Sequence, residues 1–171
     1  EELKKLMSED SLQAGTYKAE LAVIDEEVAK IQAEEIKKYP KTMTSMLIRA
    51  NQEIDVPPYE DLEEIDRKQK QYEYFRAHYF DQFDLNDPRA MRSGVIHQKI
   101  DFYLQKLTYQ VPDSQIVAMD YLLSKMDKNP EAFQYYLVHF LNESARSKRM
   151  GMDAAYVHLV DQYYAKGQAT W

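Results

Sequence analysis

The chain has 171 residues, of which 44% are hydrophobic and 30% charged, and this length fits one domain with a sizeable core. Its formal net charge of −7, with no basic tract longer than residues 146–149, argues against nucleic acid as a partner. The absence of cysteine excludes disulfides, thiol catalysis and thiolate metal sites within this chain.

The first element in chain order is a long amphipathic helix that runs to about residue 39. Apolar residues recur in it at helical spacing, which predicts a helix that buries one narrow stripe. The stripe consists of Tyr17, Leu21, Ile24, Val28 and Ile31. We expect residues 1–39 to form this long helical segment and residues 40–171 to form a helical body.

The body is predicted to contain only helices, because four glycines and six prolines supply few of the turns that an all-β chain needs. Pro40 ends the first helix, Thr42 can cap the second, and residues 56–59 form a proline-rich linker. The helical period then predicts helices over residues 42–52, 61–83, 95–109, 114–127, 131–148 and 152–164.

The joints between these helices are short, so successive helices are expected to be antiparallel neighbours. The sequence therefore predicts an all-α fold of about seven helices stacked as irregular antiparallel hairpins, superficially like a tetratricopeptide array. The spacing between helix starts is irregular, and no 34-residue repeat is visible in the chain.

Each of the four histidines has a carboxylate one helical turn further along the chain. The pairs are His78 with Asp81, His97 with Asp101, His139 with Glu143, and His158 with Asp161. Neither the Glu-x-x-His pattern of a di-iron bundle nor the zinc-protease motif is present. We therefore interpret the histidines as tethered by local carboxylates, and the sequence predicts no catalytic, cofactor-binding or metal-binding residues.

Fourteen tyrosines are the strongest compositional bias of the chain. The doublets 135–136 and 163–164 must point their two rings to different sides of a helix, so we expect one ring of each doublet to be partly exposed. Exposed tyrosines suit a protein interface, although tyrosines that rim a helical core are the more common case. A possible anion pocket from Arg89, Arg92, Arg146, Lys148 and Arg149 is the weaker reading, because the last three lie at a helix C-terminus, which favours cations.

Three segments of the second half carry a resemblance to a known family. They are Asp87–Leu107, Met152–Tyr164 and the tail with Lys166, Gly167, Ala169 and Trp171. Together these segments resemble a helical domain of unknown function from Gram-negative gut bacteria, which precedes a thioredoxin-fold domain of the TlpA or peroxiredoxin-like type.

The resemblance implies that the parent protein is an exported thiol-disulfide oxidoreductase in the periplasm or anchored to the cell envelope. Its Cys-x-x-Cys motif would lie beyond Trp171, so the present chain is expected to be a non-catalytic accessory domain. The resemblance also implies that residues 1–39 connect the body to upstream sequence. The expected partners are the thioredoxin-like domain of the same polypeptide and other envelope proteins. No apolar run approaches the roughly 20 residues that span a bilayer.

Two alternatives remain open at this point. The chain could be a free-standing helical scaffold for other envelope proteins, or it could bind a metal or small ligand through the histidine turns.

Overall fold

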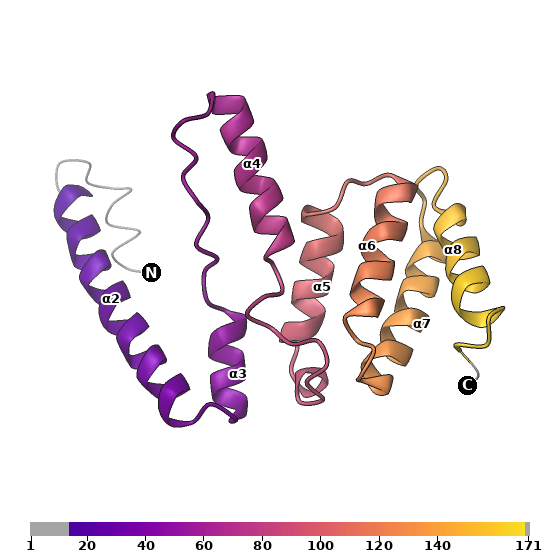
Figure 1. The fold of residues 1–171 in the computed structure, drawn as a ribbon, viewed down its shortest axis with the longest axis horizontal. Coiled ribbons are helices and arrows are strands. Elements are labelled where there is room, and N and C mark those ends of the chain that lie inside the picture. Colours follow the sequence, from indigo (N-terminus) through magenta and orange to yellow (C-terminus); the bar gives the residue numbers. More distant parts are fainter. Residues whose placement is uncertain (1–13, 170–171) are drawn as a thin grey trace. The chain divides into compact units, whose positions relative to one another are not determined.

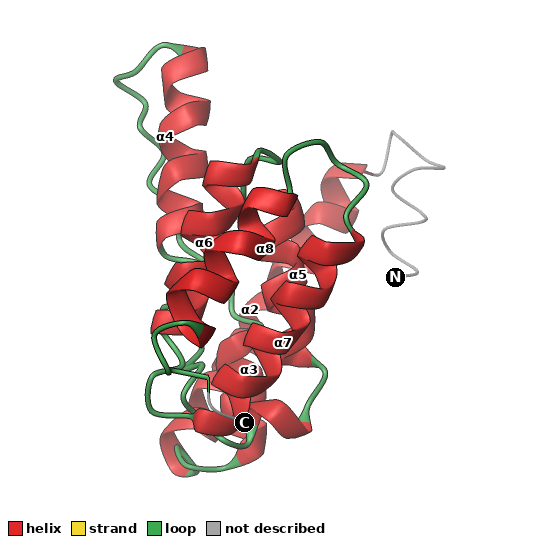
Figure 2. Cartoon of the chain, turned by 90° about the vertical axis from the view of Figure 1, so that its right-hand side faces the viewer, coloured by secondary structure: helices red, strands yellow, loops and turns green. Residues whose placement is uncertain are grey.

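A computed structural model describes residues 14–169 of the chain. The described residues form seven α-helices, a short 3-10 helix and a final π-helical turn, and none of them lies in a strand (Figure 2). The predicted all-α fold is therefore confirmed. The chain divides into two compact units, residues 1–52 and residues 53–171.

The first unit contains a helical hairpin of α2 (Ala14–Lys38) and α3 (Met43–Ala50). Thr42 caps α3 as predicted, because its side-chain oxygen accepts a hydrogen bond from the Ser45 amide at 3.2 Å. The buried Ser45 hydroxyl donates to the Tyr39 carbonyl at 2.6 Å. These bonds fix the turn that follows Pro40.

The predicted apolar stripe of α2 is not buried. Ile24 and Val28 are 46% and 44% exposed, and Ile31 is 66% exposed, while Tyr17 and Leu21 are half-buried. The reason is the length of its partner, because α3 has only eight residues and packs on α2 near the turn.

The second unit, called the body below, begins with an irregular segment and α4 (Glu64–Ala77), which is shorter than the predicted helix of residues 61–83. The chain leaves the helix at His78, whose ring packs at a tilt against Tyr74 and hydrogen-bonds Asp81. The following turns direct Phe80 and Phe83 into the core, where they are 7% and 2% exposed. Burying these rings explains why the helix ends where no glycine or proline marks a stop.

Four helices form most of the core of the body: α5 (Val95–Lys106), α6 (Pro112–Ser124), α7 (Pro130–Arg146) and α8 (Asp153–Leu159). Prolines stand at the first turn of α6 and α7, where the missing amide hydrogen has no intrahelical partner to lose. The π-helical turn Val160–Tyr164 continues from α8. Core side chains with almost no exposure are Ile100, Leu122, Leu123, Met126, Tyr136, Leu137, Phe140 and Leu159.

These helices run antiparallel to their successors, so alternate helices run parallel (Figure 1). Gly151, just before α8, lies against Pro112 at the start of α6, and His158 of α8 bonds Asp120 further along α6. In the same way His97 of α5 lies beside His139 of α7. This stacking brings residues about forty positions apart into contact, which is the geometry that positions the site described next.

Candidate functional site

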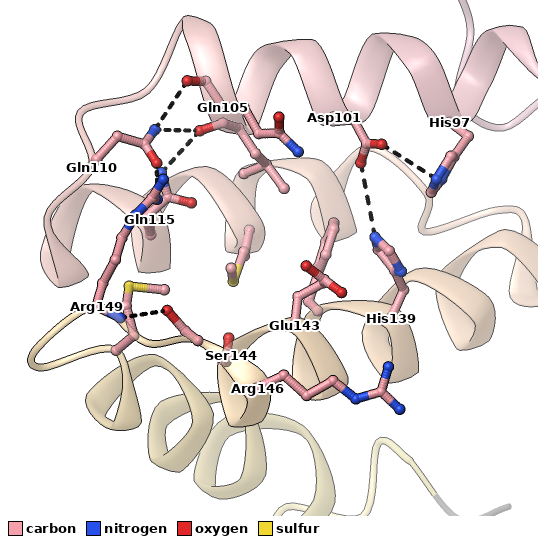
Figure 3. Close-up of a pocket in the computed structure, with 15 residues that line it drawn as sticks. His97, Asp101, Gln105, Gln110, Gln115, His139, Glu143, Ser144, Arg146 and Arg149 are labelled. Carbon is pink, nitrogen blue, oxygen red and sulfur yellow. Dashed lines mark hydrogen bonds and ion pairs between the residues drawn. The ribbon is translucent and has the colours of Figure 1, made fainter.

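A cavity of about 540 Å³ lies among α5, the start of α6, α7 and the segment that follows α7 (Figure 3). One end is lined by two histidines and two carboxylates, and the other by glutamines and arginine. The floor between the two ends is apolar, with Met119, Phe140 and Met152. It is a concave site with polar groups at both ends, which suits a small polar ligand.

The histidine end joins one turn of α5 to one residue of α7. His97 Nε2 lies 3.3 Å from Asp101 Oδ2, and His139 Nε2 lies 3.9 Å from Asp101 Oδ1. The two imidazole rings meet edge to face at 5.2 Å between centroids. Figure 3 shows the Asp101 carboxylate facing both rings, and these three residues hold ligand atoms that all lie within 4.8 Å of one another.

The surroundings of this cluster favour neutral imidazole at His139. Burial lowers the pKa of His139, and the nearby His97 lowers it further, against smaller opposing effects of Asp101 and Glu143. The ring nitrogen of His97 that faces the carboxylate is Nε2, and the other ring nitrogen, Nδ1, is buried and has no hydrogen-bond partner. Neutral imidazole is the form that binds metal ions.

The other end of the cavity satisfies the last carbonyl groups of α5. Gln115 and Gln110 both donate from their side-chain amides to the Leu104 carbonyl, at 3.0 and 2.7 Å. Arg149 in turn donates to the side-chain oxygen of Gln110. Carbonyl groups at a helix C-terminus lack intrahelical donors, so this end has a structural role in closing α5.

Of the four predicted histidine pairs, two are confirmed and two have a different partner. His78 with Asp81 at 2.6 Å and His97 with Asp101 at 3.3 Å are confirmed. His158 does not pair with Asp161, because it bonds Asp120 of α6 at 2.8 Å.

His139 also departs from its predicted pair. It faces Asp101 of α5, while Glu143 acts on it only electrostatically. For both His158 and His139, the carboxylate partner lies on a parallel neighbouring helix. The spacing along one helix identifies i+3 and i+4 neighbours and carries no information about that second helix.

The tyrosine doublets behave as predicted. Tyr136 is 1% exposed and Tyr135 is 50% exposed, while Tyr163 is buried and Tyr164 is half-buried. Burial raises the pKa of Tyr163, and the hydrogen bond from its hydroxyl to Asp120 at 2.8 Å raises it further. The inner tyrosine of each doublet therefore belongs to the core.

The five cations do not form one pocket. Arg146 and Arg149 line the cavity, whereas Arg89 forms an ion pair with Asp87, and Lys148 lines a second hollow together with Arg149. Arg146 is the last residue of α7, and Lys148 and Arg149 follow it directly, so these three cations lie at a helix C-terminus as predicted.

The fold and site define an all-α domain in which stacked helical hairpins enclose a polar cavity. Residues 26–169 match the family described as Domain of unknown function (DUF5106), and the chain belongs to this family. No curated protein and no solved structure matches the chain. Within residues 14–169, no helix combines the length and apolar character that crossing a membrane requires.

Proposed function

We propose that this chain is a non-catalytic helical accessory domain of a thiol-disulfide oxidoreductase of the cell envelope. It would position a neighbouring thioredoxin-like domain or select the partners of that domain. The proposal starts from the resemblance of residues 87–107 and 152–164, which both lie inside the range of the family match. Because the chain has no cysteine, the thiol chemistry would belong to the neighbour.

The observation that carries a binding role is the outward face of α7. Tyr135 and Val138 are 50% and 37% exposed there, and they line a shallow hollow of about 490 Å³ together with Gln134 and Asn142. An exposed tyrosine next to an aliphatic side chain is typical of contact surfaces, because the ring offers a large apolar area with a hydrogen-bonding hydroxyl.

The direct test compares the parent protein with a variant that lacks residues 1–171, using reductase activity on several disulfide substrates. An accessory role predicts a changed rate or substrate preference when these residues are removed. Identical rates and preferences would rule the role out.

A finer test replaces the exposed ring in the parent protein. If this ring lies within the contact surface, we expect Tyr135→Ala to weaken binding between this domain and the thioredoxin-like domain or its partner. The expected loss of binding free energy is roughly 1 kcal/mol or more. Tyr109→Ala is the matched control, because Tyr109 is 57% exposed at a different place in the body. Equal behaviour of the two variants would remove the α7 face as the contact surface.

The alternative function is a free-standing interaction scaffold of the cell envelope. The stacking of α5 on α7 and of α6 on α8 favours it, because tetratricopeptide scaffolds also place alternate helices in parallel. The gene sequence after residue 171 separates the two proposals. A Cys-x-x-Cys motif there supports the accessory domain, and a stop codon supports the scaffold.

A further inference from the structure

We propose that His97, Asp101 and His139 form a binding site for a divalent transition-metal ion, with zinc as the best fit. This inference goes beyond the accessory role. The sequence predicted no metal-binding residues and left metal binding through the histidine turns only as an alternative. Tetrahedral zinc sites have metal–ligand distances of about 2.0–2.1 Å, which places neighbouring ligand atoms roughly 3.3 Å apart.

One separation in the body meets that requirement, and the three ligand atoms all lie within 4.8 Å of one another. His97 Nε2 and Asp101 Oδ2 are 3.3 Å apart, while His139 Nε2 is 3.9 Å from the other carboxylate oxygen. The second distance is too long for a hydrogen bond and short enough for small side-chain rotations to close. A bound ion would therefore take His139 Nε2 as a ligand, although this nitrogen is too far from Asp101 for a hydrogen bond.

The three ligands are carried by two neighbouring helices of the body. His97 and Asp101 are one turn apart on α5, and His139 lies on the neighbouring α7 beside the fully buried Phe140. Two helices that each carry ligands facing a neighbour are a common way to build a metal site in a helical protein. The side chains of His97, Asp101 and His139 are 44%, 37% and 23% exposed, so an ion can reach them.

The donor set identifies the kind of ion. Two imidazoles and one carboxylate suit zinc and related first-row ions, whereas calcium and magnesium prefer oxygen ligands alone. Three protein ligands would leave one position of a tetrahedral ion open, and the cluster lines the same cavity as Glu143 (Figure 3). A site with three protein ligands and an open position can hold water or a small anion there.

Titration of the chain with zinc chloride by calorimetry tests the site. We expect one zinc ion per chain, and we expect His139→Ala and Asp101→Asn to weaken binding by more than the roughly 10- to 100-fold that follows loss of an outer-shell partner. Asp101→Asn nearly preserves side-chain shape, so it tests the ligand without removing a ring from the packing. Circular dichroism checks that each variant is folded.

His78→Ala is the matched control, because His78 also bonds an aspartate one turn away. This variant should bind zinc as the unaltered chain does. Failure of the unaltered chain to bind zinc, or an equal loss in His78→Ala and His139→Ala, would overturn the proposal. Cobalt gives a second readout, since tetrahedral coordination produces strong visible absorption that Asp101→Asn should remove.

Discussion

The α2–α3 hairpin and the helical body bury the same residue types to very different extents. Ile31 of α2 is 66% exposed, whereas Ile100 of α5 is fully buried. Both residues belong to helices with apolar residues at helical spacing. What differs is the number of helices that cover each apolar face.

In the body, a helix is covered by several neighbouring helices. Helix α6 packs on α5, α7 and α8, whereas among the described residues of the hairpin α2 packs on the short α3. An amphipathic helix gains most of its stability from tertiary packing of its apolar face. The comparison shows that a helical period predicts a helix reliably, while burial of its stripe depends on partners that the period does not reveal.

The sharpest way to break this comparison is a matched pair of isoleucine substitutions. Ile100→Ala should lower the free energy of unfolding of the body by about 2–5 kcal/mol, because it removes buried methyl groups and leaves a cavity. Ile31→Ala should change the free energy of unfolding by less than about 0.5 kcal/mol, because its side chain is exposed. Urea denaturation followed by circular dichroism measures both. A loss from Ile31→Ala as large as that from Ile100→Ala would mean that α2 is covered by a partner in solution.

Much of the fold follows from the sequence because its signals are local. Thr42 and the prolines that open α6 and α7 act within one turn, and each stands at a helix start. The end of α4 could not be predicted in this way. It ends at Ala77 because Phe80 and Phe83 are buried, and burial depends on residues far along the chain.

The candidate site could likewise be predicted from the sequence only where its contacts are local. His97 and Asp101 lie on one helix, and their contact follows from the spacing alone. His139 lies beside them because α5 and α7 are parallel neighbours. A chain without a visible sequence repeat does not indicate that these two helices are neighbours. One signal was available in the sequence, since a histidine with a carboxylate one turn on occurs in both helices.

A smaller effect tests the long-range polar contacts of the body. Asp120 accepts a hydrogen bond from the Tyr163 hydroxyl at 2.8 Å and lies 2.8 Å from His158 Nε2, so it connects α6 to α8 and the π-helical turn. We expect Asp120→Asn to lower the free energy of unfolding by about 1–2 kcal/mol, because an amide is a weaker acceptor than a carboxylate. Thermal denaturation with a urea series measures the loss.

Asp81→Asn is the control for that experiment. Asp81 also bonds a histidine, but its side chain is 59% exposed and its partner is three residues away. Exposed pairs of this kind contribute less than about 1 kcal/mol. If Asp81→Asn destabilised the protein as much as Asp120→Asn, local pairs would matter as much as contacts between helices.

The smallest effects come from the two helix caps, one in each unit. Asn129 accepts from the Ala132 amide at the start of α7, and Thr42 accepts from the Ser45 amide at the start of α3, both at 3.2 Å. Replacing either residue with alanine should remove about 1 kcal/mol of local helix stability. For Asn129→Ala we expect this loss in the unfolding of the whole body, because α7 lies in its core. For Thr42→Ala we expect faster hydrogen exchange confined to α3, because the hairpin is a separate compact unit. Exchange measured by mass spectrometry distinguishes the two outcomes, and faster exchange in α7 of the Thr42→Ala protein would show that the hairpin and the body unfold together.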